Sequence, residues 1–248
     1  SRIEYALKGG RIYTDFIDNS AGVDCSDHEV NIKILLNTVV SDGDMTEKQR
    51  NKLLADMTDE VAELVLNNNY QQTQAISLTA ERAAASVDLH HRLIEEMMHK
   101  GQINAELEFL PNEQELMERK ANGKGLTRPE LAILFAYNKS LLKAEILNSN
   151  VPEDPYLSEA LIFAFPRPLQ VKFHDAMKKH RLSREIIATL LSNALINEMG
   201  FAFVAQLQNE TGAPVSAVVR AYTIIRRVLH WPKVRSDIEK LDYKISSE

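Results

Sequence analysis

The stretch TRPELAILFAYNKSLL, residues 127–142, carries the strongest helix signal of this chain. Thr127, Pro129 and Glu130 together give a strong helix start, with the proline in the first turn, where its missing N–H does no harm. One face of the following segment is apolar and consists of Leu131, Leu134, Phe135, Leu141 and Leu142. The stretch therefore predicts a long helix that buries one side.

Helical spacing of apolar residues extends on both sides of this stretch, from about residue 30 to the end of the chain. Thr46 and Gln49 fit a capping box at the start of another helix. The expected helices lie near 30–40, 47–65, 77–100, 187–195 and 218–229, with the last long helix stopping at Trp231-Pro232. Residues 67–72 are polar and predict either a loop or a poor segment of helix. The class is mainly α, with six to nine helices that pack on each other.

Only the N-terminus departs from this pattern. Residues 3–7 and 11–16 are rich in β-branched and aromatic side chains, and Gly9-Gly10 between them can supply the positive φ angles of a tight turn. We therefore expect a small N-terminal β-hairpin, the alternative being a frayed arm. The first residues, Ser1-Arg2, replace the usual initiator methionine, and we interpret the chain as a piece of a longer protein.

Composition narrows the function classes. The chain has 248 residues, 44% of them hydrophobic and 26% charged, as in soluble globular proteins. A net charge of −6 argues against a nucleic-acid surface, and no apolar run approaches the ~20 residues that span a bilayer. A single cysteine, Cys25, excludes an internal disulfide and fits a reducing cytoplasm.

Residues 18–29 gather the chemically active side chains and allow several interpretations. Cys25 and His28 have the C-x-x-H spacing of a metal site, although no second such element exists in the sequence. The same pair suggests a nucleophilic thiol, although a local pair is not the pattern of cysteine proteases. A third possibility is a polar loop that presents backbone N–H groups and a hydroxyl to an anion. The simplest one, a helix start capped by Asp24 or Ser26 with nothing bound, is favoured by local pattern alone.

Three other groups are weaker candidates. His91 and Glu95 are four residues apart on a histidine-rich helix that also carries His90 and His99, which suggests a metal site or a solvated face. Basic residues around Gly123 and Gly125 either hold an anion or simply precede a helix: Lys120, Lys124 and Arg128. The basic tail either docks on an acidic surface or faces water: Arg220, Arg226, Arg227, Lys233 and Arg235.

Two long stretches resemble a known family. Residues 18–37, DNSAGVDCSDHEVNIKILLN, and residues 121–132, ANGKGLTRPELA, are similar to the large bacterial NAD-glutamate dehydrogenases. The first stretch also resembles the shorter glutamate dehydrogenases, which carry Asn-Ala-Gly-Gly-Val followed by Ser and then Glu. Five residues fall in register without a gap: Asn19, Gly22, Val23, Ser26 and Glu29. The match departs at Ser20 and Ala21, so the exact path of the loop is left open.

The resemblance implies roles for three of these residues. Asn19 would face the NAD cofactor, Ser26 would bind the γ-carboxylate of glutamate, and Val23 would line the substrate pocket. The family's catalytic lysine and aspartate have no counterpart here, and the sequence has no G-x-G-x-x-G motif for a dinucleotide. No catalytic or metal-ligating residue is therefore expected, and the chain should be inactive alone.

The resemblance also implies an organisation. Residues 1–42 would be the C-terminal edge of the catalytic region, with the hairpin as its remnant, and residues 43–248 a helical C-terminal domain. The whole enzyme would convert L-glutamate, NAD⁺ and water to 2-oxoglutarate, ammonia and NADH in the cytoplasm, as a homo-oligomer that serves amino-acid catabolism. The helical domain would have a structural or regulatory role against the rest of its own chain. The alternatives are a stand-alone helical protein-interaction module and a dehydrogenase for a different amino acid.

Overall fold

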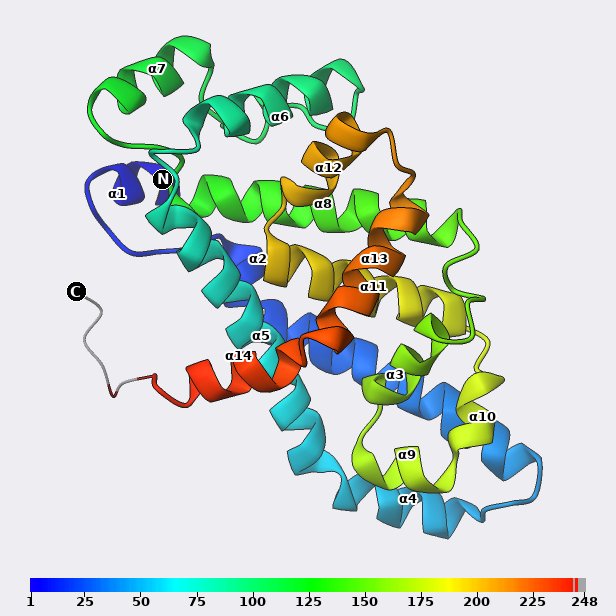
Figure 1. Ribbon diagram of the computed structural model, residues 1–248. Helices are drawn as coiled ribbons and strands as arrows, with labels where there is room; N and C mark the ends of the chain where they lie inside the picture. The colour runs from blue at the N-terminus through cyan, green and yellow to red at the C-terminus, as the bar shows by residue number, and fades with distance from the viewer. Residues whose placement is uncertain (243, 245–248) are drawn as a thin grey trace.

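The computed structural model describes residues 1–242 and residue 244. Within these residues the fold is helical and contains no strand (Figure 1). The elements are α1 (Arg2–Leu7), α2 (Asp15–Asp18), α3 (Ser20–Ser41), α4 (Glu47–Asp56), α5 (Thr58–Glu81), α6 (Val87–His99), α7 (Glu113–Ala121), α8 (Arg128–Leu147), the 3₁₀ helix η1 (Leu157–Ala164), α9 (Arg167–Lys172), α10 (His174–Lys178), α11 (Ser183–Met199), α12 (Phe203–Thr211), α13 (Val215–Val228) and α14 (Trp231–Glu239). The mainly α class is confirmed, with more helices than the six to nine expected.

The centre of the molecule is the pair α8 and α11, which lie side by side (Figure 1). The helices α3 and α5 pack on each other and α5 also contacts both central helices, while η1 covers α11. One apolar cluster runs through all of these elements, from Ile17 on α2 to Tyr222 on α13. Its largest fully buried side chains include Phe135, Phe165 and Phe201. The N-terminal and C-terminal parts of the chain therefore share a single core.

The predicted start of α8 is confirmed, and its capping carboxylate also forms a buried ion pair with α7. The carboxylate of Glu130 accepts hydrogen bonds from the backbone N–H and the hydroxyl of Thr127, at 2.7 and 2.8 Å. The same carboxylate, 0% exposed, accepts two hydrogen bonds from Nη1 of Arg119 on α7, at 2.8 and 3.0 Å. A buried charge needs such partners to be tolerated. Glu130 therefore ties α7 to the first turn of α8. The capping box of Thr46 and Gln49 is confirmed as well.

The predicted N-terminal β-hairpin is wrong. Ser1 and Glu4 form a capping box that starts α1, and Gly9, at φ +91°, ends this helix. The next residue, Gly10, lies so close to the ring of Tyr5 that a Cβ atom would require this ring to move. The β-branched and aromatic residues misled the prediction, because an S-x-x-E pattern at the very start outweighs strand propensity. Gly9-Gly10 ends a helix instead of joining two strands.

The expected helix boundaries hold in some places and differ in others. The polar residues 67–72, for which loop and poor helix were both open, are helical and lie inside α5. The expected helix over residues 77–100 is broken, because α5 ends at Glu81 and α6 begins at Val87. The last long helix, α13, ends at Val228, before Trp231-Pro232 as expected, and Trp231 opens a further helix, α14, with the proline in its first turn.

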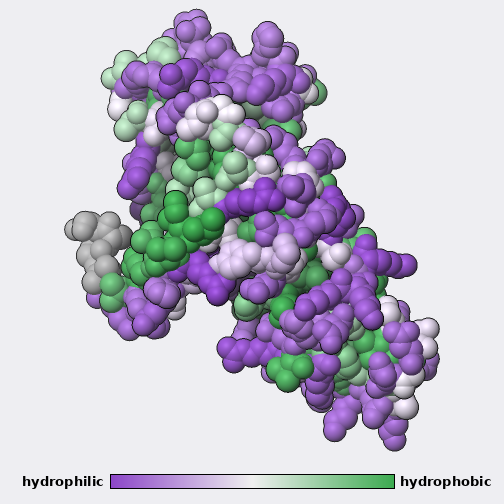
Figure 2. Space-filling model, turned by 45° about the vertical axis from the view of Figure 1, so that its right-hand side comes forward, coloured by the Kyte–Doolittle hydropathy of each residue, from purple (hydrophilic) through white to green (hydrophobic). Residues whose placement is uncertain are grey.

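The surface carries an apolar patch on the last two helices. Exposed apolar side chains gather there and at the turn that follows α14 (Figure 2): Ile224, Ile225, Val228, Leu229, Val234, Ile238 and Leu241. Contiguous exposed apolar surface of this kind is typical of an interaction face.

Among the described residues, no individual helix has the length and apolar character needed to cross a membrane. The helices α11 and α12, which are bent by 88° relative to each other, reach this length and apolar character only when the two are taken together.

Candidate functional site

The three residues assigned to the site lie on one face of one helix. Asn19 immediately precedes α3, and Val23 and Ser26 follow at spacings of four and three residues, which places all three on the same side. All three are exposed, Val23 to 68%. The buried face of α3 is a different one and carries Ile32, Leu35, Leu36 and Val39. We call the exposed face formed by Asn19, Val23 and Ser26 the α3 stripe.

The local setting of Ser26 differs from the expected polar loop. Residues 20–29 are already helical, and Ser26 lies in the second turn of α3, beyond the free N–H groups of the helix start. Its hydroxyl donates a hydrogen bond to the carbonyl of Gly22, at 3.2 Å. Neither Asp24 nor Ser26 caps the helix, because the residue at the cap is Asn19, whose side chain makes no capping bond. An anion would therefore be bound by the hydroxyl itself and not by the helix terminus.

The start of α3 is held by asparagines on α5. The amide of Asn69 donates to the carbonyl of Ile17 at 3.3 Å and to the hydroxyl of Ser20 at 2.7 Å. The amide of Asn68 donates to the carboxylate of Asp24 at 2.8 Å. These contacts explain the polar stretch inside α5. No local sequence signal could have paired residues about fifty positions apart.

The middle of α3 is held by a second contact, which comes from His180 in the connection between α10 and α11. His180 is buried between α10 and α11, and its Nδ1 accepts a hydrogen bond from the N–H of Leu182 at 3.1 Å. The proton of this ring therefore sits on Nε2, which donates to the carbonyl of Asn31 at 3.1 Å. Burial lowers the pKa of His180, which keeps the ring neutral in this bridge.

The metal and thiol alternatives gain no support. His28 faces Asp24, with 3.8 Å between the ring Nε2 and the carboxylate, and Cys25 is exposed. His91 pairs with Glu95 at 3.4 Å on the surface of α6. Among residues 1–242 and 244, no group of three or more His, Cys, Asp or Glu side chains is placed to hold a metal.

The second matched stretch, residues 121–132, is structural. Gly123 adopts φ +66°, and Gly125 passes so close to the backbone of Ala83 that a Cβ atom would overlap it. The basic side chains around these glycines are largely engaged: Lys120 binds Asp88 at 2.6 Å, and Arg128 lies 3.6 Å from Glu81. This loop is a tight connection between α7 and α8, and two of its three basic side chains are already paired.

The basic tail folds back on the chain. Glu198, at the end of α11, has a side chain that is 4% exposed and accepts hydrogen bonds from Nε of Arg226 at 3.0 Å and from the hydroxyl of Tyr222 at 2.6 Å. Arg235 on α14 lies 3.9 Å from the same carboxylate, and Arg220 pairs with Asp154 at 3.0 Å. Burial, and after it the neighbouring carboxylate of Glu198, raises the pKa of Tyr222. This cluster was missed, because its members are far apart in sequence and each looks like a surface charge.

His90 should make this chain sensitive to acid. Its side chain is buried, and desolvation lowers its pKa to about 4, whereas a histidine in an unfolded chain titrates near pH ~6.5. The unfolded chain therefore takes up this proton first. Above the pKa of the unfolded histidine, this group does not lower the free energy of unfolding. As the pH drops from there towards the folded pKa, the free energy of unfolding falls by about 3 kcal/mol in total.

Urea unfolding of the chain at one pH above this window and one inside it measures the effect. The substitution His90→Gln should remove most of the loss, whereas His91→Gln, one position along α6, should leave it in place. An equal pH dependence in wild type and His90→Gln would contradict the burial argument.

Comparison with known families defines the class of this chain. Residues 123–248 match the family model described as glutamate dehydrogenase, C-terminal. Residues 1–79 match the model described as bacterial NAD-glutamate dehydrogenase, catalytic domain. The α3 stripe thus falls in the part that resembles a catalytic domain, and α8 to α14 fall in the C-terminal part.

Relatives that match this chain along its whole length identify its family. The chain is 52% identical over all of its length to the NAD-specific glutamate dehydrogenase of Pseudomonas aeruginosa and 50% identical to that of Halomonas elongata. The protein of this name from Mycobacterium tuberculosis is 39% identical over 95% of the chain. The chain belongs to the NAD-specific glutamate dehydrogenase family. It spans about 15% of the length of these relatives.

Proposed function

We propose that the full-length protein that contains this chain oxidises L-glutamate to 2-oxoglutarate and ammonia, with hydride transfer from the α-carbon to NAD⁺. The observation that carries the proposal is a match that extends over the entire chain to relatives named for this activity. A stand-alone interaction module is not favoured, because those relatives hold the matching sequence within much longer chains.

The α3 stripe would form one wall of the substrate site. Ser26 would rotate its hydroxyl away from the carbonyl of Gly22 and donate to the γ-carboxylate of glutamate, Val23 would contact the substrate, and Asn19 would face the nicotinamide. Their common, exposed face supports this assignment. A hydroxyl that donates to a carboxylate forms a charge-assisted hydrogen bond, which is stronger than its bond to a backbone carbonyl.

The helical region would act as a brace or a regulatory element. It contacts α3 through Asn68, Asn69 and His180, which supports a positioning role. The apolar patch on α13 and α14 would contact the rest of the same polypeptide or another copy in a homo-oligomer. The division into residues 1–42 and 43–248, a cytoplasmic location and a role in amino-acid catabolism remain parts of the proposal.

Steady-state assays of the purified full-length enzyme test the proposal. NADH should form with L-glutamate and NAD⁺, much more slowly with NADP⁺, and negligibly with L-aspartate or L-leucine, while the 248-residue chain alone should form none. A preference for L-leucine or L-aspartate would instead favour a dehydrogenase for another amino acid. No NADH formation with any of these amino acids would remove the enzymatic proposal.

A further inference from the structure

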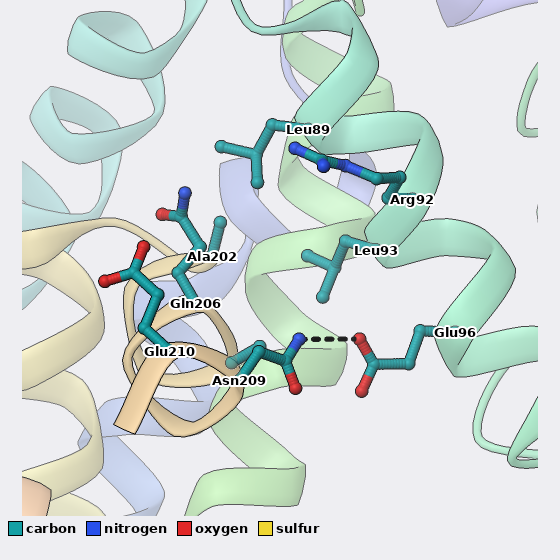
Figure 3. Close-up of a pocket in the computed structure, with 9 residues that line it drawn as sticks. Leu89, Arg92, Leu93, Glu96, Ala202, Gln206, Asn209 and Glu210 are labelled. Atoms are coloured by element: carbon teal, nitrogen blue, oxygen red, sulfur yellow. Dashed lines mark hydrogen bonds between the residues drawn. The ribbon is translucent and has the colours of Figure 1, made fainter. Parts of the chain in front are cut away.

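A cavity of about 360 Å³ opens between α5, α6 and the junction of α11 and α12. It lies next to a second cavity of about 300 Å³ between α6 and α12, and Figure 3 shows the wall that the two share, formed by Leu89, Ala202 and Gln206. The first cavity falls within the size range of small-molecule sites, at its lower end. It is separate from the α3 stripe, since none of its lining residues belongs to α3.

Two residues in the wall of this cavity each carry a buried polar atom that has no partner among the described residues. Nδ1 of His90 and Oδ1 of Asn197 are buried and make no hydrogen bond within residues 1–242 and 244. His90 is 2% exposed, and its ring packs 5.3 Å from that of Phe201. Leaving such groups unpaired costs about 1–3 kcal/mol each, so unpaired buried groups call for an explanation. The amide oxygen of Asn197 can only accept a hydrogen bond, so its missing partner is an O–H or N–H donor.

The charged groups around the cavity favour an anion. Arg82, at the end of α5, lines the rim and forms no ion pair with any described residue. The carboxylate of Glu198 also reaches the wall, but Arg226 and Arg235 already neutralise it. Because burial keeps His90 neutral, the exposed guanidinium of Arg82 at the rim is the positive charge that a ligand would meet.

We propose that this cavity binds a small organic anion that also carries a hydroxyl donor. The anionic group would pair with Arg82, the hydroxyl would donate to Oδ1 of Asn197, and a second polar atom would meet Nδ1 of His90. Leu89 and Phe201 give the cavity apolar sides that would enclose the carbon frame.

Calorimetric titration of the full-length enzyme tests the site, with excess NAD⁺ present so that the dinucleotide site is filled. The probes are sn-glycerol 3-phosphate and propyl phosphate, which share a phosphate ester but differ in hydroxyl groups. Glycerol phosphate should bind more tightly than propyl phosphate. Arg82→Gln should weaken both by roughly tenfold, and Arg82→Lys should restore part of the loss.

Matched variants separate this cavity from other anion sites. Asn197→Ala should remove the preference for glycerol phosphate, because the acceptor for its hydroxyl is gone. Arg92→Gln, a charge change on the adjoining cavity of Figure 3, should leave both affinities unchanged. The proposal is overturned if neither ester binds, or if Arg82→Gln and Arg92→Gln give the same affinities as wild type. Because binding is the readout, these outcomes do not depend on glutamate turnover.

Discussion

Replacing Ser26 by alanine in the full-length enzyme should lower kcat/KM for glutamate by roughly ten- to hundredfold. This range corresponds to the loss of one hydrogen bond to a charged group, which contributes about 1.5–3 kcal/mol. The fold should not suffer, because Ser26 is exposed and its own hydrogen bond, to the carbonyl of Gly22, is local. The affinity for NAD⁺ should be kept, because Ser26 is assigned to the substrate and Asn19 to the cofactor. Steady-state kinetics with varied glutamate and varied NAD⁺ measures both.

Thr38 on the same helix provides a matched control. Its hydroxyl also donates to the carbonyl four residues earlier, that of Ile34, at 3.1 Å, and it is also exposed. It lies more than three helical turns from Ser26 and off the α3 stripe. Thr38→Ala should therefore leave kcat/KM within about twofold of wild type, as expected for a surface change. Equal kinetics for the two variants would reduce the α3 stripe to an ordinary solvent-exposed helix face.

Replacing Glu130 by alanine should destabilise the chain by about 3–5 kcal/mol, the cost of breaking a buried charge pair from one side. The change removes the acceptor for Thr127 and leaves the guanidinium of Arg119 without its carboxylate. The connection between α7 and α8 then loses its anchor. Urea unfolding followed by circular dichroism gives the difference in free energy of unfolding.

Glu115 on α7 tests whether burial is the reason. It holds the same third position of a capping box, where its carboxylate accepts from the N–H of Asn112 at 3.0 Å, but it is exposed. Glu115→Ala should therefore cost only about 1 kcal/mol. A similar loss in both variants would mean that the cap, and not the buried pair with Arg119, stabilises the start of α8.

Local signals in the sequence were sufficient for much of the fold. The capping pairs Thr46 with Gln49 and Thr127 with Glu130 each begin a helix where expected, because the interaction lies within one turn. Apolar spacing also predicted α8 and α11, although residues 129–135 of α8 are buried on every side and not only on the expected face. The N-terminus was predicted wrongly, because the capping pair of Ser1 and Glu4 was overlooked in favour of strand propensity.

The site was only partly predictable. Residue spacing alone places Asn19, Val23 and Ser26 on one helical face once the segment is known to be helical, but the segment was expected to be a loop. The contacts of Asn69 and His180 with this helix could not be inferred, because they join residues far apart in sequence. The same holds for the gathering of Tyr222, Arg226 and Arg235 around Glu198.

The supports of α3 bear on how this enzyme can be shortened. A catalytic core trimmed after residue 42 would keep Ser26 but lose Asn68, Asn69 and His180, which fix the start and the middle of the helix. The buried side of α3 would then be bared, with Leu35 and Leu36 facing water. A shortened protein should therefore retain α5 and the segment from α10 to the start of α11, because removing them would take away the support of the proposed substrate wall.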